Sequence, residues 1–466
     1  MKVVVGVDLG STTTKAILLD EQRRIVGKGI TNSRSNYEVA CAVAREEALT
    51  AARFTMLERE LERRASALTK SAQDSEHALH EAYRLETYLD QLNELHEEME
   101  KVLKSLSFIS DRGKLSPAIR EVLDQMRSDA AQLFDGAGAR RSDFFRDLAA
   151  AGYMSAAERV AAGSKGALSY ERLTGVFDRA ILDVETRLQS RDFGAILRRA
   201  ARRLTAEDGS AAGRALLEAV ESAATQPIDE VSFVGTGYGR QTLPFPKQAV
   251  KSEILCHGRG AHRVFPGTRT VLDIGGQDTK AIQVDDHGVV TSFQMNDRCA
   301  AGCGRYLGYI ADELNLGLHE LGPLALGAQR TVKVNSTCTV FAGAELRERL
   351  GLGERREDIL AGLHRSIMLR AMSLLARSGG ILNEFTFTGG VCKNPMATKV
   401  LRELVDENYE KGIVLNAHAD SIYMGALGAA LFGVDDLEAG RPAILPTFVE
   451  KARAGSAMTT AAAPAE

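Results

Sequence analysis

The strongest constraint on the fold is a short motif that occurs twice. The stretches Asp8–Lys15 and Asp273–Lys280 share the spacing Asp-x-Gly…Lys, and each lies between two runs of residues typical of β-strands. Glycine lets the backbone approach a phosphate closely and point its N–H groups at it. Hydroxyls and a lysine add donors, and the leading aspartate can hold hydrated Mg²⁺. Neither stretch is a Walker A motif, which needs a strand, a loop and a helix with Gly-Lys-Ser/Thr.

One glycine-rich hairpin of this kind is often a plain structural turn. Two matching ones, each opening an α/β half, predict a pair of pseudo-twofold related halves that grip one nucleotide between them. A third glycine turn, Thr388–Val391, follows the apolar strand Glu384–Phe387 and suits close approach of the base or ribose.

Between the two motifs the residue composition and the spacing of apolar residues change. Residues 37–108 contain almost no Gly or Pro, and apolar side chains recur in steps of three and four, which is typical of a coiled-coil-like seam. Arg64 and His96 interrupt this seam, and Gly113–Pro117 breaks it. More helical stretches follow up to residue 205. We expect a helical hairpin or small bundle with solvated charged faces, and docking of another protein chain is compatible with it.

The expected domain divisions follow from these changes. They are 1–36 plus 206–268 as the first ATPase lobe, 37–205 as the helical insertion, 269–435 as the second lobe, and 436–466 as a C-terminal extension whose last residues are disordered.

Composition excludes some classes of function. The net charge of the 466 residues is −4 with both signs mixed, so nothing steers the chain to nucleic acid or an anionic membrane. The start Met1–Val5 is strand-like rather than a signal peptide, and we find no apolar run long enough to span a bilayer. We therefore expect a cytoplasmic location. Six cysteines in a chain of this length do not suggest a disulfide scaffold.

Two of the cysteines stand at predicted helix N-termini. Cys299 precedes a helix over 305–314, and Cys338 precedes one over 342–350. The helix dipole there favours the thiolate, the form that binds metal. Spacing alone leaves buried structural thiols and metal ligands both open, because two thiolates cannot complete a four-cysteine shell. Cys41, Cys256 and Cys392 fit buried small residues better.

Outside the insertion, the chain resembles the actin/hexokinase/Hsp70-type ATPases. The resemblance implies an α/β fold with two lobes, here with a large inserted α-helical domain. It also implies that Asp8 and Asp273 order Mg²⁺ and water, while Gln277 and Asp278 approach the γ-phosphate. The residues expected to bind ATP are Gly10, Ser11, Thr12, Thr13, Lys15, Gly275, Gly276, Lys280, Gly389, Gly390 and Asn394.

A narrower resemblance is to the 2-hydroxyacyl-CoA dehydratase activators and the ATPase subunits of benzoyl-CoA reductases. The matching stretches are Asp8–Lys15, Thr236–Arg240, His257–Ala261, Asp273–Lys280, Met295–Gly302, Ser336–Phe341 and Gly389–Asn394. In this family two protomers each give two cysteines to one [4Fe–4S] cluster, and Cys299 and Cys338 match those ligands. Cys303 and Gly343 depart from the usual pattern, and Cys303 is either a spare thiol near the cluster or an alternative ligand.

The insertion and the early segment Gly29–Tyr37 look most like the longer of the two ATPase subunits of the ATP-dependent benzoyl-CoA reductases. This resemblance implies a heterotetramer with two catalytic acyl-CoA-reducing subunits and a shorter homologous ATPase subunit. It implies the cofactors ATP, Mg²⁺ and a bridging [4Fe–4S] cluster. ATP hydrolysis would drive electron transfer from ferredoxin, with benzoyl-CoA dearomatised on the partners during anaerobic aromatic degradation.

Three other functions stay open. The chain could instead be an activator of a 2-hydroxyacyl-CoA dehydratase or a small-molecule kinase of the same fold. It could also be a regulatory ATPase or scaffold whose helical block carries the function. The sequence does not specify the acyl-CoA, the ATP used per electron, the role of the insertion, or homodimer against heterodimer.

Overall fold

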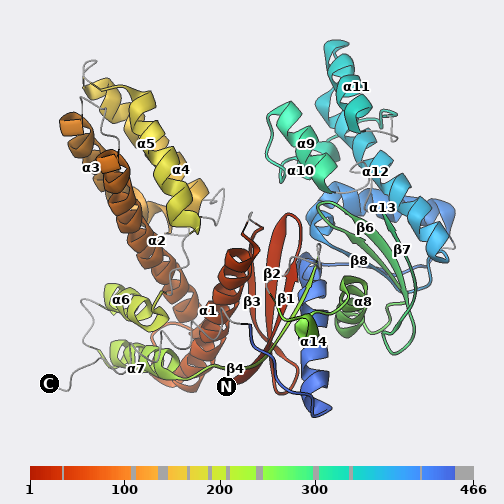
Figure 1. Cartoon of the computed structure of the whole chain (residues 1–466), viewed down its shortest axis with the longest axis horizontal. Helices are drawn as coiled ribbons and strands as arrows, with labels where there is room; N and C mark the ends of the chain where they lie inside the picture. Colours follow the sequence, from red (N-terminus) through yellow and green to blue (C-terminus); the bar gives the residue numbers. More distant parts are fainter. Residues whose placement is uncertain are drawn as a thin grey trace. The chain divides into compact units, whose positions relative to one another are not determined.

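The computed structural model divides the chain into two compact units, each described here by itself (Figure 1). The first contains Met1–Ala52 and Ile228–Glu466, and the second is Arg53–Pro227. The described residues are 1–33, 36–105, 112–134, 145–164, 168–186, 191–205, 210–237, 245–296, 304–334, 339–409 and 412–446.

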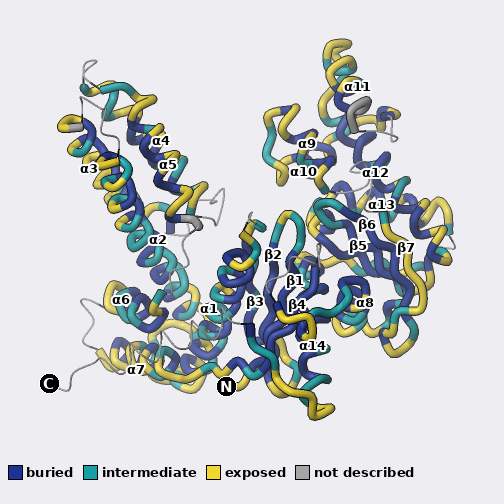
Figure 2. Tube along the Cα trace, in the orientation of Figure 1, coloured by how far each residue is buried: buried dark blue, intermediate teal, exposed yellow. Residues whose placement is uncertain are grey.

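The first sheet of the first unit has four strands in the order β3-β2-β1-β4. They are β1 (Lys2–Leu9), β2 (Thr13–Asp20), β3 (Ile25–Asn32) and β4 (Asp229–Gly237). β1 pairs with β2 in antiparallel fashion and with β4 in parallel fashion. β1 and β2 are buried almost along their whole length because helices cover both faces of the sheet (Figure 2).

The second sheet has the order β7-β6-β5-β8-β9. Its strands are β5 (Thr270–Ile274), β6 (Thr279–Val284), β7 (Val290–Asn296), β8 (Phe385–Thr388) and β9 (Leu415–Ala417). β5 again pairs antiparallel with the next strand and parallel with a later one, β8. The edge strand β7 is largely exposed, unlike β5 and β6.

Two helices, α8 (Glu253–Val264) and α14 (Met424–Glu438), form the centre of this unit. One hydrophobic cluster joins them to inward side chains of both sheets, such as Val4 of β1 and Val271 of β5. Gly428 lets the two helices touch, because a Cβ there would lie 1.9 Å from the carbonyl oxygen of Cys256. The inner face of each sheet is thus built against one shared helical layer.

The outer faces of the sheets carry other helices. α1 (Tyr37–Arg63) lies directly on β3: a Cβ on Gly29 would come within 2.0 Å of the carbonyl oxygen of Ala44. The first half of α1 therefore belongs to the first unit although its second half enters the second. The domain divisions drawn from the sequence stay a prediction.

On the second sheet, α12 (Arg356–Ser378) packs against β6 and β7. By length and composition α12 is apolar enough to cross a membrane, but 67% of its apolar window is buried inside the structure, as in the core helices of many proteins. The remaining helices of this unit are α9 (Gly304–Leu314), α10 (Leu321–Leu326), α11 (Thr339–Gly351) and α13 (Pro395–Asn408).

The second unit is all-helical in its described residues. Besides the end of α1, its α-helices are α2 (Ala72–Ser105), α3 (Arg112–Asp129), α4 (Phe145–Gly163), α5 (Tyr170–Thr186), α6 (Phe193–Thr205) and α7 (Ala211–Thr225). The predicted seam ends near Arg64, where α1 stops, but α2 runs straight through His96. α3 also continues through Pro117, which was expected to lie in a break.

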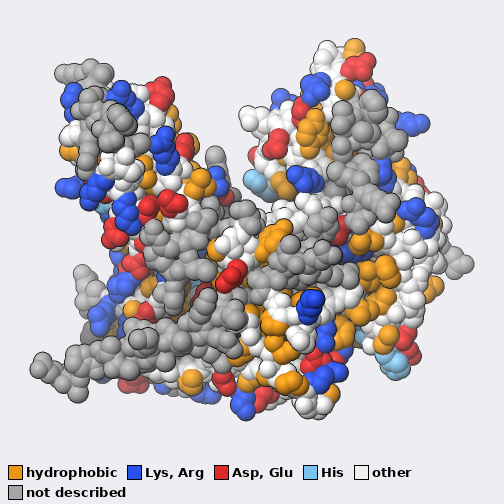
Figure 3. Space-filling model, in the orientation of Figure 1, with side chains coloured by type: hydrophobic (Ala, Val, Ile, Leu, Met, Phe, Trp, Pro, Cys, Tyr) orange, Lys and Arg blue, Asp and Glu red, His pale blue; other side chains and the backbone are white. Residues whose placement is uncertain are grey.

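The surface of both units carries mixed charge. On the face drawn in Figure 3, acidic and basic side chains alternate over the described residues, without a large region of one sign. In the second unit, for example, Glu86 pairs with Arg199 at 3.0 Å and with Arg203 at 2.5 Å. These pairs join α2 to α6, while the core of the unit is apolar and rich in leucine and alanine.

Candidate functional site

The two sheets place the repeated motif at the same position in each half. Asp8 on β1 faces Lys15 on β2 and Thr236 on β4. In the second sheet, Asp273 occupies the position of Asp8, facing Lys280 on β6 and Thr388 on β8. The spacing that the sequence shares is therefore a shared cross-strand register.

The repeat extends to a glycine after each threonine. Gly237 has a φ of +130° and Gly389 a φ of +85°, which side chains rarely adopt. A Cβ on Gly237 would lie 2.2 Å from the carbonyl oxygen of Leu9, and one on Gly389 would lie 2.3 Å from that of Ile274. Both glycines thus let a parallel strand turn away beside the residue that follows the motif's aspartate.

The first loop, Gly10–Thr12, is supported from β3. The amide of Ser33 donates a 2.8 Å hydrogen bond to the carbonyl of Thr12, and its hydroxyl donates a 2.5 Å bond to the carbonyl of Gly10. Thr12 itself is exposed, and Ser11 is half-buried. The loop is held by its carbonyls, which leaves these hydroxyls available to a ligand.

The second loop, Gly275–Asp278, is a tight turn that touches the first. The amide of Gly275 donates a 3.0 Å hydrogen bond to the carbonyl of Asp278. A Cβ on Gly276 would lie 2.0 Å from Oγ1 of Thr12 and 3.1 Å from Oγ of Ser11. The structure therefore brings the two predicted phosphate loops into direct contact, with the backbone of Gly276 against the side chains of Ser11 and Thr12.

Under the second loop lies a buried group of charges around Lys280, which is 1% exposed. Its Nζ lies 2.9 Å from Glu253 Oε1, 3.3 Å from Asp273 Oδ2 and 2.8 Å from Asp278 Oδ2. Burial lowers the pKa of Lys280, but these three carboxylates outweigh burial and raise it. Lys280 therefore stays charged, and its ammonium group is fully used in ion pairs with these three carboxylates.

The lysine of the first loop is placed differently. Lys15 Nζ has a more distant contact of 3.8 Å with Asp8 Oδ2 and lies close to Gly10, whose Cβ would be 3.1 Å away. The two lysines share a register but not an environment. Lys15 retains donor capacity for a phosphate, whereas the ammonium of Lys280 already faces three carboxylates.

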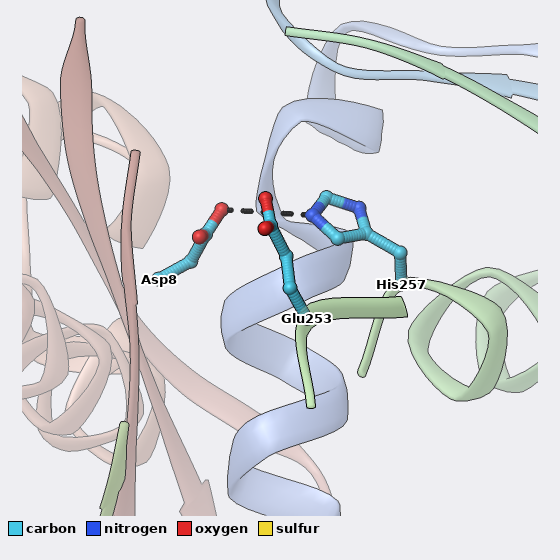
Figure 4. Close-up of side chains that lie close together, drawn as sticks. All are labelled: Asp8, Glu253 and His257. Carbon is cyan, nitrogen blue, oxygen red and sulfur yellow. Dashed lines mark ion pairs between the residues drawn. The ribbon is translucent and has the colours of Figure 1, made fainter. Parts of the chain in front are cut away.

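His257 on α8 lies between the two leading aspartates. Its Nδ1 is 3.2 Å from Asp273 Oδ1 and its Nε2 is 3.9 Å from Asp8 Oδ2. Figure 4 shows His257 and Glu253 projecting toward Asp8 from one end of α8. The two residues are four positions apart, so they lie on the same face of the helix.

The acidic groups respond differently to burial. Burial raises the pKa of Asp273, but His257, Lys280 and a 2.9 Å hydrogen bond from Thr388 Oγ1 outweigh it and lower that pKa to about 2. Burial raises the pKa of Glu253; Lys280 opposes this rise, while Asp278 and Asp8 add to it. Asp273 is therefore ionised at neutral pH, whereas burial disfavours the charged form of Glu253.

The site has room for a cation between Asp8 and His257. Gly425, in the first turn of α14, faces this space, and a Cβ there would lie 2.8 Å from both Asp8 Oδ2 and His257 Nε2. Asp8 Oδ1 is buried and has no hydrogen-bond partner among the described residues. Since a buried polar atom without a partner is costly, this geometry fits a divalent cation at Asp8.

The third glycine turn is also described. Gly389 directly follows β8, and Gly390 begins a short 3₁₀ helix, Gly390–Lys393. The Asn394 side-chain oxygen caps α13 by accepting from the amides of Met396 and Ala397, and its Nδ2 lies 2.9 Å from His364 Nε2. This side chain is thus engaged in structure. Its role in ATP binding stays a prediction, and so does the approach of Gln277 to the γ-phosphate.

The proposed cluster ligands Cys299 and Cys338, and Cys303, lie outside the described residues. The helices expected after them are confirmed, since α9 begins at Gly304 and α11 at Thr339. Cys41, Cys256 and Cys392 are confirmed as buried free thiols. Burial raises the pKa of Cys256 to about 12, so it is protonated at neutral pH.

The sequence indicated no role for Glu253, His257 or Gly425. His257 stands in a stretch that matches the family, but nothing in the spacing shows that it lies between Asp8 and Asp273. The available signal was the Glu-x-x-x-His pair at the start of an amphipathic helix, which gains meaning only once α8 is known to lie between the sheets.

Comparison with known proteins now decides the family. The sequence profile of the BadF/BadG/BcrA/BcrD ATPase family matches residues 5–433. The chain belongs to this family. Members of the BadF/BadG/BcrA/BcrD family are ATPases, which agrees with two phosphate loops in contact.

Sequence identity to individual relatives shows which members of the family this chain resembles most among those compared. The chain is 39% identical over 223 residues to the (R)-2-hydroxyglutaryl-CoA dehydratase activating ATPase of Acidaminococcus fermentans, which covers 48% of this chain and 83% of that protein. It is 34% identical over 204 residues to one of the subunits of the Thauera aromatica benzoyl-CoA reductase, covering 44% and 72%. Within the BadF/BadG/BcrA/BcrD family the similarity to the dehydratase activator is the stronger, and the expected membership among the longer ATPase subunits of benzoyl-CoA reductases is not shown.

A solved structure supports the fold. The crystal structure of component A of the Acidaminococcus fermentans dehydratase aligns with a TM-score of 0.51 and 22% identity, covering 94% of this chain and 99% of that one. The expected fold class, an actin/hexokinase-like ATPase, is thereby confirmed for this member of the BadF/BadG/BcrA/BcrD family.

Proposed function

We propose that the chain is the ATP-hydrolysing activator of a CoA-ester enzyme of the 2-hydroxyacyl-CoA dehydratase type, acting in the cytoplasm. The observation that carries this proposal is the contact between the two phosphate loops, which hold Asp8 and Asp273 at matched registers in a chain of this ATPase family. The relative of highest identity reported above is an activating ATPase of such a dehydratase.

In this proposal the loops bind the phosphates of ATP. Amides and hydroxyls of Ser11, Thr12 and Thr13, with the backbone of Gly275 and Gly276, would contact them. Gly10 and Gly390 would allow close approach. Lys15 would add a positive charge, because its ammonium is not closely paired. When bound, Mg²⁺ neutralises charge on the phosphate oxygens.

The acidic residues would then prepare water for attack. Asp8 would order the hydrated cation, and Asp273, Gln277 and Asp278 would orient a water toward the γ-phosphate. Lys280 would hold the carboxylates of Asp273 and Asp278 in position, because its Nζ lies within 3.3 Å of both. A firm anion beside the phosphate site fits water positioning, since catalysis of phosphoryl transfer depends mainly on positioning and electrostatics.

The electron-transfer part of the proposal rests on Cys299 and Cys338. Cys299 precedes α9 in the sequence and Cys338 precedes α11; each would supply a thiolate, and a second ATPase protomer would supply the other two ligands of a [4Fe–4S] cluster. A ferredoxin is the proposed reductant and the dehydratase component the acceptor. The dimer partner is then either a second copy or a shorter homologue.

The experiment compares ATP hydrolysis and iron content in anoxically purified protein. Asp8→Asn and Asp273→Asn should lower ATP hydrolysis at least about tenfold, and Cys299→Ser or Cys338→Ser should lose iron but still bind nucleotide. Cys41→Ala is the matched control, because this thiol is buried among apolar residues of the first sheet. Unchanged hydrolysis would contradict the ATP site, and unchanged iron would contradict the cluster ligands.

A second candidate is an ATPase component of a benzoyl-CoA reductase. The 34% identity to the Thauera aromatica reductase protein and the large helical unit Arg53–Pro227 favour it. Isolation of the native complex separates the two candidates, because a reductase predicts benzoyl-CoA dearomatisation and a shorter homologous ATPase. The dehydratase activator predicts 2-hydroxyacyl-CoA dehydration by the co-purifying chains.

A further inference from the structure

The charges around the phosphate loops do not balance. Four buried carboxylates, those of Asp8, Glu253, Asp273 and Asp278, face two ammonium groups, those of Lys15 and Lys280. The carboxyl groups thus outnumber the ammonium groups by two. A divalent cation bound among them would compensate negative charge that is costly to bury.

Three residues of this cluster converge on one point. Asp8, Glu253 and His257 each offer a ligand atom, and these atoms all lie within 4.8 Å of one another. Two ligands bound at about 2.1 Å to one ion are separated by roughly 3 to 4 Å. The 3.9 Å between His257 Nε2 and Asp8 Oδ2 falls in that range, whereas it is too long for a direct hydrogen bond.

The other side of the imidazole faces a carboxylate. Asp273 Oδ1 lies 3.2 Å from His257 Nδ1, but the two atoms are not aligned as a hydrogen bond. His257 Nε2 faces the carboxylate of Asp8, so one cation between them could take both groups as ligands.

Asp8 and Gly425 supply independent evidence for a ligand here. Asp8 Oδ1 is buried, and among the described residues no donor reaches it. Gly425 keeps the space between Asp8 and His257 open, because any Cβ at that position would come within 2.8 Å of both ligand atoms.

We propose that the divalent cation of this site is bound directly by His257 Nε2 together with Asp8 and Glu253, and that the nitrogen ligand makes the site prefer Mn²⁺ to Mg²⁺. Mg²⁺ favours an all-oxygen octahedral shell, whereas imidazole suits transition ions. This inference rests on the proposed ATP site for its place in catalysis, but it concerns a cation that the protein binds without nucleotide.

The test uses the full-length protein, treated with a chelator, under anoxia and without nucleotide. Mn²⁺ is titrated in and its binding followed by loss of the EPR signal of the free ion. Pulsed EPR of bound Mn²⁺ should show a ¹⁴N coupling that changes to ¹⁵N when the protein is labelled with ¹⁵N-histidine. His257→Gln should remove this coupling and weaken Mn²⁺ binding by about 10- to 100-fold, while Mg²⁺ binding changes far less.

His262→Gln is the matched control, because His262 lies on the same helix and outside the cluster; it should keep the coupling. Bound Mn²⁺ without a histidine coupling in the wild-type protein overturns the inference, and so does a coupling that survives in His257→Gln. Absence of nucleotide-free Mn²⁺ binding also overturns it. ATP hydrolysis measured on the same samples keeps these outcomes separate, since its loss in the wild-type protein would contradict the proposed function instead.

Discussion

The backbone amide of Gly304 donates a 2.8 Å hydrogen bond to the carbonyl of Gly275. The next amide, that of Arg305, donates a 2.7 Å bond to the carbonyl of Gly276. The first amides of a helix have no hydrogen-bond acceptor within the helix, so carbonyls of the second phosphate loop accept the hydrogen bonds from the first two amides of α9. A displacement of this loop is therefore transmitted to a helix that begins directly after Cys303.

This connection predicts a local response to nucleotide. Binding of a non-hydrolysable ATP analogue should fix the second loop and slow hydrogen exchange at the Gly304 and Arg305 amides by about tenfold or more. Amides in the last turn of α9 should change little, because their partners lie within the helix. Exchange resolved to single residues provides the measurement, and equal slowing along the whole of α9 would contradict a connection through the loop.

Contact between the two loops predicts a strong effect of Gly276→Ala. The new methyl group would lie 2.0 Å from Thr12 Oγ1 and 3.0 Å from Thr12 Cβ, so the Thr12 side chain must rotate and the two loops must shift apart by a few tenths of an ångström. Overpacking of this kind costs about 1–3 kcal/mol, and we expect nucleotide affinity to fall by roughly tenfold or more. Isothermal titration with ADP measures this loss.

Gly308→Ala is the control for that variant, because a Cβ at Gly308 in α9 has no neighbour within 4 Å. Its nucleotide affinity should equal that of the wild-type protein. Equal affinity of both variants would mean that the loop contact does not limit binding.

Lys280 should be essential for stability as well as for charge. Lys280→Met leaves Asp273, Asp278 and Glu253 buried without their common cation, and removal of one partner from a buried ion pair costs about 3–5 kcal/mol. Lys28→Met provides the comparison, since Lys28 and Asp420 form a partly exposed pair at 2.8 Å worth at most about 1 kcal/mol. Urea unfolding of both variants tests the difference, and similar midpoints would contradict the role assigned to Lys280.

The low pKa of Asp273 predicts acid sensitivity. Its folded-state pKa of about 2 lies below the ordinary value of 3.8, so the folded state binds this proton less readily than the unfolded chain. The resulting stabilisation, about 2 kcal/mol, is complete above pH 3.8 and disappears as the pH falls toward 2. In metal-free protein, the free energy of unfolding should therefore fall over this interval in the wild type and less steeply in Asp273→Asn. Parallel curves would contradict the assignment.

The strands around the two repeated motifs and the tight turns between them could be predicted from the sequence because their signals are local. Asp8–Lys15 and Asp273–Lys280 contain the turn glycines and the flanking strand residues within a few positions. The ends of the helices in the insertion were harder to predict from the sequence. His96 lies within α2 because its neighbours Leu92, Leu95 and Met99 are buried in one core, and tertiary packing overrides a local polar interruption.

The chemistry around the loops depends on distant segments and could not be predicted in full. Lys15 and Lys280 match in sequence, yet Glu253 from α8 forms its ion pair with Lys280. His257 gains its position because α8 packs between the two sheets, and Gly425 matters because α14 begins beside Asp8. Asp8 is separated from these partners by more than 200 positions, and a single sequence offers no spacing rule at that range.

The ends of the helical unit meet. Arg53 Nη1 donates a 3.3 Å hydrogen bond to the carbonyl of Gln226, while Lys2 on β1 is paired with Asp229 on β4 just beyond it. The sheet that carries Asp8 is thus closed by strands on either side of the insertion. In evolutionary terms, a segment whose two ends meet can be inserted or deleted in one event without changing the sheets of the ATPase. Members of this family could therefore differ in their inserted domains while they keep the same ATPase fold.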